Sequence, residues 1–194
     1  MQVFWQKGYE ATSISDLTVA MGINPPSLYA AFGDKERLFL ETVEHYSQSR
    51  GDSCPYCNEP TAREAVERLL AYMARELTDE SCHPRGCMMM MAAATSSNAS
   101  ASLQKILSDK RTGSRDRLKT RIKRGIRDGD VPAGTDAGAL ADFYSTIMTG
   151  MAMQARDGAT RKSLLATVER AMSLFPEAPK PAAKKRGRRE AQAA

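Results

Sequence analysis

The chain has 194 residues, a formal net charge of +5 and 42% hydrophobic residues. This length suits one ordinary domain or a small domain joined to a larger one, and the hydrophobic fraction is sufficient for a packed core. No apolar run approaches the roughly 18 to 20 residues of a membrane span, and the first residues lack the pattern of a secretory signal. We therefore expect a soluble, cytoplasmic protein with no membrane contact.

Residues 12–36 predict two short helices joined by a tight turn. Thr12 or Ser13 can cap the first helix, and Gly22 can end it in the positive-φ conformation of a C-terminal cap. Asn24 is a suitable N-cap for the second helix, with Pro25 at the first position, where no N–H is needed. This pattern is typical of a helix-turn-helix, a motif whose second helix enters a DNA groove.

Charge is distributed unevenly along the chain. Acidic side chains outnumber basic ones in residues 1–50, so phosphate contacts there would depend on a few placed groups and helix N-termini. Residues 177–194 are rich in Pro, Ala, Lys and Arg and predict a disordered basic tail. Its Arg186-Gly187-Arg188 element either reaches a minor groove or belongs to a solubilising polycation, and the composition favours the second interpretation.

Helical periodicity dominates the remaining sequence, and strand-like alternation is absent from it. Thr61-x-x-Glu64 is a capping box at the start of an amphipathic segment. We expect helices over residues 61–77, 88–94, 103–127, 136–157 and 160–174. The predicted fold is all-α, with a helix-turn-helix three-helix module in residues 1–48, a larger helical effector-binding and dimerisation domain in 49–176, and the tail.

The helix predicted over residues 103–127 carries ten basic residues between Lys105 and Arg127. Leu107, Leu118, Ile122 and Ile126 mark its buried side. We expect most of the basic residues to lie on the solvated face, in preference to forming a stripe for nucleic acid.

The N-terminal motif resembles the DNA-binding signature of the TetR family of bacterial transcriptional regulators. The resemblance covers about 30 residues, and the Gly150–Ala159 stretch is similar to the dimer region of one subgroup. It implies a homodimeric repressor that binds a palindromic double-stranded operator and that a small-molecule effector releases, with no cofactor. Relatives have further residues before the equivalent of Phe4-Trp5, so we expect the first helix to be incomplete. The matching segments are Gly8-Tyr9, Thr12-Ser13-Ile14, Gly22-Ile23-Asn24, Ser27-Leu28-Tyr29 and Phe32-x-x-Lys35-Glu36.

The resemblance also implies which residues contact DNA. The hydroxyls of Thr12, Ser13 and Tyr29 and the ammonium of Lys35 are expected at backbone phosphates. The start of the second motif helix is expected at base edges. The full predicted set is Thr12, Ser13, Asn24, Pro25, Pro26, Ser27, Tyr29 and Lys35.

Apolar residues of the larger domain suggest two further sites. The last two helices carry broad apolar faces that predict a dimer interface, for which an intramolecular core is the alternative. Methionines and aromatic residues predict an adaptable effector pocket, for which plain core packing is the alternative. The predicted interface consists of Phe143, Ile147, Met151, Leu164, Val168 and Met172, and the predicted pocket of Met88, Met91, Phe143, Tyr144, Ile147 and Met151.

Four cysteines support a competing hypothesis. The Cys54/Cys57 and Cys82/Cys87 pairs could form a thiol-redox or metal-responsive sensor. They flank the helix predicted from Thr61 at opposite ends, about 25 Å apart at 1.5 Å per residue, so a shared site needs a loop to fold back. With only His45 and His83 as histidines and no catalytic set in view, we predict a regulator without enzymatic activity or bound metal.

Overall fold

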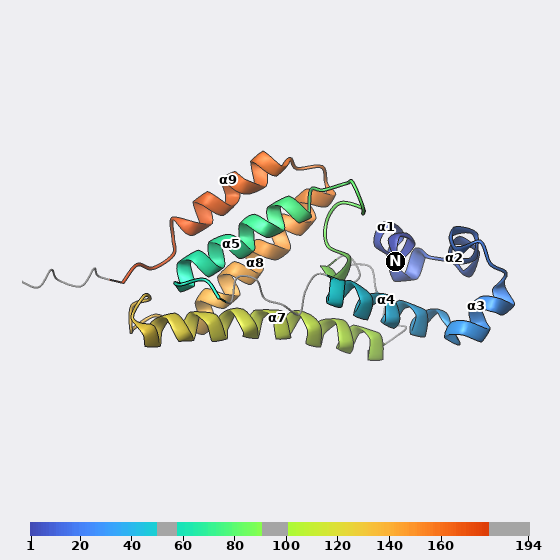
Figure 1. Cartoon of the computed structure of the whole chain (residues 1–194), viewed down its shortest axis with the longest axis horizontal. Coiled ribbons are helices and arrows are strands. Elements are labelled where there is room, and N and C mark those ends of the chain that lie inside the picture. The colour runs from blue at the N-terminus through green and yellow to red at the C-terminus, as the bar shows by residue number, and fades with distance from the viewer. Residues whose placement is uncertain (50–57, 91–100, 179–194) are drawn as a thin grey trace, which may run out of the picture.

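A computed structural model describes residues 1–49, 58–90 and 101–178, and all regular elements in these ranges are helices (Figure 1). The all-α prediction is therefore confirmed. No helix in the described ranges is long and apolar enough to cross a membrane. The elements are α1 (Gln2–Ala11), α2 (Ile14–Met21), α3 (Pro25–Phe32), α4 (Lys35–Ser49), α5 (Ala62–Glu76), α7 (Ala101–Asp128), α8 (Ala137–Arg156) and α9 (Arg161–Met172).

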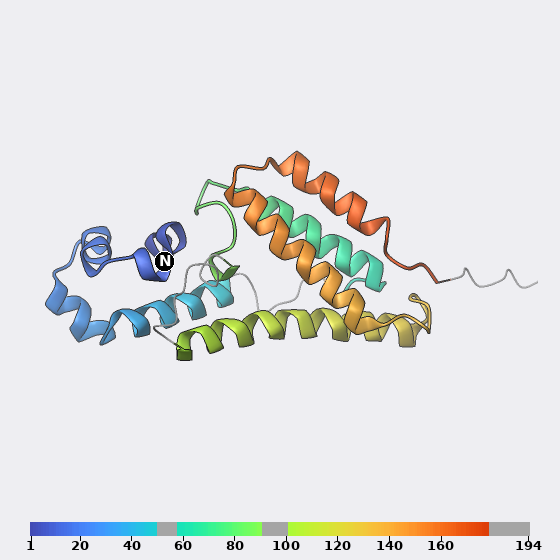
Figure 2. The same cartoon turned by 180° about the vertical axis from the view of Figure 1, so that it is seen from behind.

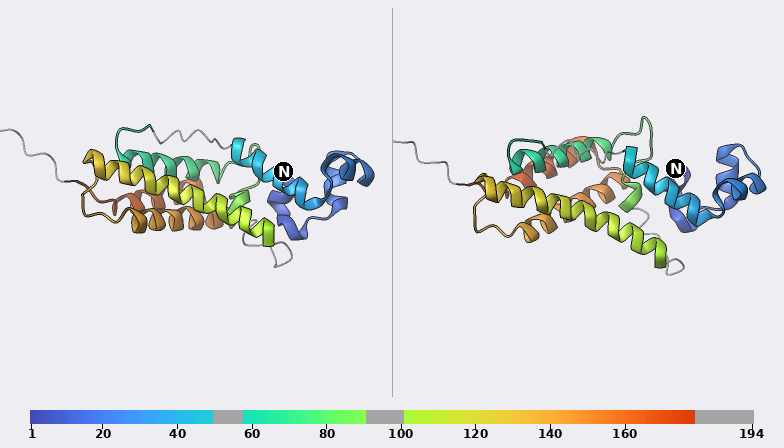
Figure 3. Two further views of the ribbon diagram at one scale, coloured as in Figure 1. Left: turned by 90° about the horizontal axis from the view of Figure 1, so that it is seen from below. Right: turned by 60° about the horizontal axis from the view of Figure 1, so that its bottom comes forward.

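The molecule is elongated, with a small helical head at one end. Helices α1–α4 form this head, and α5, α8 and α9 pack together at the other end (Figures 1 and 2). The long helix α7 runs beneath the larger domain and reaches α4 with its first turns (Figure 3). Ser102 Oγ donates to Glu36 at 2.8 Å, and Lys110 Nζ lies 2.7 Å from a Glu44 carboxylate oxygen. The head is thus joined to the larger domain through α7.

Two hydrophobic clusters hold the structure together. The first centres on Trp5, Leu28 and Phe39 of the head and includes Met88, Leu103 and Leu107 from beyond it. The second is built from α5, α7, α8 and α9. The core of the head therefore continues past residue 48 into the rest of the chain.

Capping residues define the two short motif helices. Ser13 Oγ accepts a hydrogen bond from the Asp16 N–H at 3.0 Å, and Asp16 accepts one from the Ser13 N–H at 2.9 Å, which makes a capping box. Gly22 ends α2 at φ 65°, in the left-handed conformation that favours glycine. Asn24 caps α3 by accepting from the Ser27 N–H at 2.9 Å. The predicted caps at Ser13, Gly22 and Asn24 are confirmed.

The larger domain also follows its local signals. Thr61 and Glu64 form the predicted capping box of α5, and α7, α8 and α9 lie within two residues of the predicted ranges. Leu107, Leu118 and Ile122 are buried as expected. Among the basic residues of α7, Arg121 is the buried exception: it is 5% exposed and donates to the Glu59 carbonyl oxygen at 2.9 Å.

Helices α5 and α7 approach closely at Gly125. A methyl group at this position would lie 2.6 Å from Ala62 Cβ and 2.9 Å from Val131 Cγ2. Both distances are too short for carbon atoms in van der Waals contact. Asp130 also accepts a hydrogen bond from the Ala62 N–H at 2.6 Å. The crossing therefore requires a residue without a side chain.

We expect Gly125→Ala to lower the free energy of unfolding by about 1–3 kcal/mol, because overpacking forces the helices apart. Gly113→Ala on the same helix is the matched control, since among the described residues only Arg117 Nη1, at 3.9 Å, comes within 4 Å of the added methyl. That change should stabilise the protein by up to about 1 kcal/mol through helix propensity. Urea unfolding measures both, and equal effects of the two substitutions would contradict the close approach.

Acid should weaken the α2 cap through Asp16. The Lys7 ammonium beside its carboxylate and the hydrogen bonds from Ser13 lower the pKa of Asp16 from 3.8 to about 2. The cap therefore contributes its full stability above pH 4 and loses it as the pH falls through 2. In urea unfolding, the stability difference between the wild type and Asp16→Asn should shrink from pH 4 to pH 2. A difference that stays constant would show that Asp16 does not stabilise the cap electrostatically.

Candidate nucleic-acid interface and ligand cavity

Helix α3 is anchored on one side and open to solvent on the other. Leu28 is fully buried in the head core and fixes the helix against its neighbours. The Tyr29 ring beside it is 48% exposed. The structure brings the exposed predicted residues of this helix to one end of the molecule, namely Asn24, Pro25, Pro26, Ser27 and Tyr29. This end presents a helix N-terminus with small polar groups and a phenol to an incoming ligand.

Two predicted phosphate contacts at the start of α2 differ in their surroundings. Ser13 is exposed at the helix N-terminus. Thr12 is only 1% exposed, and its hydroxyl donates to the Gly8 carbonyl oxygen at 2.6 Å. Gly8 interrupts α1 at φ 79°, and the Thr12 hydroxyl binds a carbonyl beside this break. The Thr12 side chain thus stabilises the turn, and its predicted contact with DNA stays a prediction.

Lys35 is held over the junction of α1 and α2. Its Nζ donates to the Thr12 carbonyl oxygen at 2.9 Å and lies 4.5 Å from the centroid of the Tyr9 ring. Both contacts favour one position of the ammonium group. The charge is thus fixed close to the N-terminus of α2, and the predicted phosphate contact stays a prediction.

Most of the predicted dimer interface is part of the chain's own core. Met151, Leu164, Val168 and Met172 are at most 4% exposed and pack with α5 and the other helices of the larger domain. Their apolar sides are covered within one chain, as in the alternative of an intramolecular core. Phe143 and Ile147 are half-buried at the edge of this core.

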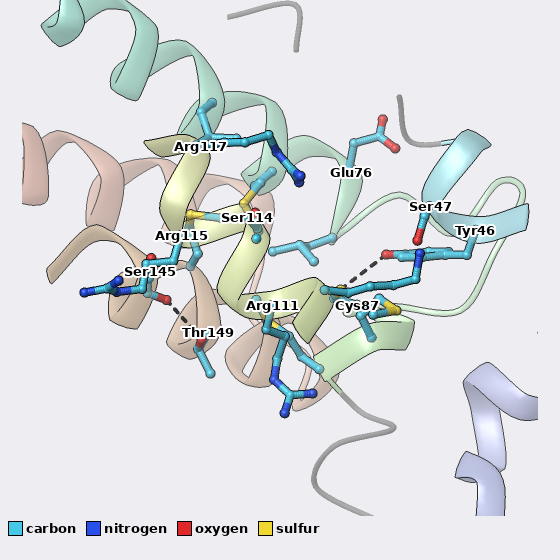
Figure 4. A pocket seen from close by; sticks show the side chains of 18 of the residues that line it. Tyr46, Ser47, Glu76, Cys87, Arg111, Ser114, Arg115, Arg117, Ser145 and Thr149 are labelled. Atoms are coloured by element: carbon cyan, nitrogen blue, oxygen red, sulfur yellow. Dashed lines mark hydrogen bonds between the residues drawn. The ribbon is translucent and has the colours of Figure 1, made fainter. Parts of the chain in front are cut away.

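A cavity of about 620 Å³ lies between α4, α5, α7 and α8 (Figure 4). Its volume is in the range of sites for drug-sized molecules. Apolar side chains supply much of the wall, and all four helices contribute hydroxyl or charged groups. The apolar lining residues of the described chain are Leu69, Met73, Leu77, Met89, Met90, Ile106 and Met148.

None of the predicted effector-pocket residues that the structure describes lines this cavity. Met88 is buried in the head cluster, and Tyr144 and Met151 are buried in the larger cluster. Phe143 and Ile147 pack against that larger cluster and do not line the cavity. Met91 lies outside the described residues. Gly113 faces the cavity from within α7, and a glycine inside a long helix is the sequence signal that marks this wall.

The described cysteines are free thiols in different surroundings. Cys82 is exposed, and Cys87 lines the cavity, where its Sγ accepts a hydrogen bond from the Tyr46 hydroxyl at 3.3 Å. Cys54 and Cys57 lie outside the described residues. Within the described ranges, no group of three or more His, Cys, Asp and Glu side chains is arranged to hold a metal ion.

The segment that leads into the cavity also contacts the head. The His83 ring stacks on Trp5 of α1, with centroids 4.6 Å apart and an interplanar angle of 10°. Gln2 Nε2 donates to the Cys82 carbonyl oxygen at 3.1 Å. Arg156, at the end of α8, donates to the carbonyl oxygens of Trp5 at 3.3 Å and Gln6 at 2.5 Å. Helix α1 is thereby fixed to the larger domain at several points.

Comparison with known proteins gives matches along nearly the whole chain. Residues 1–42 match the bacterial regulatory proteins of the tetR family, and residues 63–174 match the tetracyclin repressor-like C-terminal domain. The HTH-type transcriptional repressor ComR of Escherichia coli (strain K12) is 31% identical over 180 residues, which is 91% of this chain and 85% of ComR. The repressor BdcR of the same organism is 28% identical over 85% of this chain and 79% of its own length.

Solved structures agree with these matches. A cysteine variant of the TetR family transcriptional regulator CifR, in complex with 26-base-pair double-strand operator DNA, is 43% identical. It superimposes with a TM-score of 0.86 over 90% of this chain and 92% of that protein. A TetR transcriptional regulator from Rhodococcus sp. RHA1 is 38% identical, with a TM-score of 0.64 over 92% of this chain and 96% of its own. The chain is a member of the TetR family of bacterial transcriptional regulators.

Proposed function

We propose that the protein is a homodimeric repressor of the cytoplasm that binds a palindromic operator through α2 and α3 and leaves it when a small molecule enters the cavity. It acts as a binding protein without catalytic activity. The observation that carries the proposal is the exposed N-terminal end of α3, held by the Asn24 cap and the buried Leu28. This is the end of the second motif helix that contacts base edges in helix-turn-helix proteins.

The similar proteins support the same function. ComR and BdcR are repressors, and the CifR structure holds operator DNA. We infer that Asn24, Pro25, Pro26 and Ser27 face base edges, with Ser13, Tyr29 and Lys35 at phosphates. The comparisons favour this regulator function over the thiol or metal sensor built on the Cys54/Cys57 and Cys82/Cys87 pairs.

Because Met151, Leu164, Val168 and Met172 are buried within one chain, we infer that the homodimer forms through other residues of α8 and α9. Phe143 and Ile147 are half-buried, Gly150 is exposed, and Met153 is 40% exposed on the outer side of α8. Leu174, beyond α9, is 64% exposed. An apolar strip beside a glycine allows the helices of two chains to pack closely. A two-fold axis through this strip would place two heads so that each contacts one half-site of a palindromic operator.

The contacts of α1 explain how a ligand would act on the head. Cys87, Met89 and Met90 line the cavity, and His83 in the same segment stacks on Trp5. A ligand that prefers another position of this segment would therefore shift α1, and by linkage DNA and ligand would weaken each other's binding.

We expect Tyr29→Phe to weaken binding to a duplex from upstream of the protein's own gene about tenfold, because one hydrogen bond to a charged phosphate is lost. Fluorescence anisotropy measures this loss, with a scrambled duplex as the reference for sequence specificity. Tyr72→Phe, at a tyrosine of α5 that is 37% exposed, is the matched control and should bind as the wild type does. Equal affinity of wild type and Tyr29→Phe would remove Tyr29 from the interface, and equal affinity for both duplexes would overturn the proposed function.

We expect Arg156→Ala to loosen α1, because the carbonyl oxygens of Trp5 and Gln6 lose their donor. Hydrogen exchange should speed up in residues 2–7 and stay unchanged in α9. Arg170→Ala, at an exposed arginine of α9, is the control and should leave α1 unchanged. Unaltered exchange in α1 of the Arg156 variant would show that this contact does not hold the head.

A further inference from the structure

The charges around the cavity are unequal in sign. Four of its lining residues are cations of α7, whereas the described lining includes two carboxylates, Glu76 and Asp109. The cations are Lys110, Arg111, Arg115 and Arg117. An excess of positive charge at an otherwise apolar cavity favours an anionic occupant.

Most of these charges already have partners. Lys110 Nζ lies 2.7 Å from Glu44, and Asp109 forms an ion pair with Lys105 at 2.8 Å. Arg115 binds both carboxylate oxygens of Asp142 through Nε and Nη2. Within the described residues, this leaves Arg111 and Arg117 without an ion pair or hydrogen bond.

The two remaining arginines lie on different sides of the cavity. Arg117 is exposed and, with the Glu76 carboxylate, lies on the α5 side, whereas Arg111 lies on the side of α8 and Thr149 (Figure 4). Arg111 is half-buried, and its Nη1 is buried with no hydrogen-bond partner among the described residues. Leaving a buried cationic N–H without an acceptor costs free energy. An acceptor oxygen of a bound ligand would remove this cost at Arg111 Nη1.

The α7 wall leaves room beside Arg117. Among the described residues, a Cβ at Gly113 would meet only Arg117 Nη1 within 4 Å, at 3.9 Å. Ser114, three residues after Arg111 and so on the same side of the helix, is a small lining residue. Methionines from three parts of the chain, Met73 of α5, Met89 and Met90, and Met148 of α8, form flexible apolar walls around this space.

We propose that the effector is an organic anion with an apolar body, whose carboxylate, sulfonate or phosphate group binds the Arg111 guanidinium while the body lies against the methionine-lined wall. An arginine can offer such a group two parallel hydrogen bonds, which favours planar and tetrahedral oxyanions over neutral molecules of the same shape. The inference rests on the proposed function, because it treats the cavity as the effector site.

The test compares probes that differ only in charge. Anilinonaphthalene sulfonate and the uncharged naphthylphenylamine share an aromatic body, and decanoate and decanol share an alkyl body. Binding is measured by fluorescence and calorimetry with the full chain in the absence of DNA. We expect the anion of at least one pair to bind about ten- to a hundredfold more tightly than its neutral analogue. The pair that shows the difference identifies the aromatic or the alkyl body.

Variants connect this difference to Arg111. Arg111→Met should remove the preference for the anion and leave the neutral analogue unaffected, and Arg111→Lys should keep part of the preference because the charge remains. Arg127→Met, at an exposed arginine near the end of α7, is the matched control and should bind as the wild type does. Unfolding curves of the variants show that they are folded.

Two results overturn the inference: neutral analogues that bind as tightly as the anions in both pairs, or an Arg111→Met variant that keeps the full preference. Both results concern ligand binding alone, so neither would contradict the proposed binding of operator DNA. If the anion binds through Arg111 but does not displace the operator duplex, the ligand class stands and the release step of the proposed function fails.

Discussion

The position of the head depends on the burial of Trp5. Its indole is 1% exposed, lies edge-on to Tyr46 of α4 with ring centroids 5.0 Å apart, and stacks on His83 of the segment that leads to the cavity. Its carbonyl oxygen accepts a hydrogen bond from Arg156 of α8. One residue of α1 thus contacts three separate parts of the chain. Since aromatic pairs of this kind add to the free energy of burial, movement of any one part is resisted by the others.

The contacts around Trp5 also link the head to the cavity. Tyr46 contacts Trp5 with its ring and donates its hydroxyl to Cys87, which lines the cavity. Gly86, next to Cys87, lies against the backbone of α8, where an added Cβ would be 3.2 Å from the Ala152 carbonyl oxygen. A ligand that displaces this segment therefore acts on packed contacts, which favour discrete positions over gradual deformation.

Local signals were enough to predict the helix-turn-helix and the fold class. Ser13, Gly22 and Asn24 act through atoms within three or four residues, so their roles can be inferred without knowledge of the tertiary structure. Periodicity likewise predicted that Leu164 and Met172 are buried, but it contains no information on whether the same chain or a partner covers them. Thr12 illustrates the same limit, because the direction of its hydroxyl depends on the break at Gly8.

Apart from the signal at Gly113, the lining of the cavity was beyond prediction for a different reason. Arg111 and Gly113 belong to a helix rich in basic residues, where periodicity assigns cations to the solvent. Only the crossing of α4, α5, α7 and α8 creates a cavity beside them, and such a crossing depends on contacts far apart in sequence.

We infer that the protein, as a two-fold dimer, contacts two operator half-sites through its two copies of α3. Hydroxyl-radical footprinting of the DNA upstream of the protein's own gene tests it most directly, because it maps the contacted sugars along both strands. We predict two protected segments with symmetry-related sequences, centred about one helical turn, or 10 base pairs, or a multiple of that apart. A single protected segment, or protection spread evenly over the fragment, would contradict the claim.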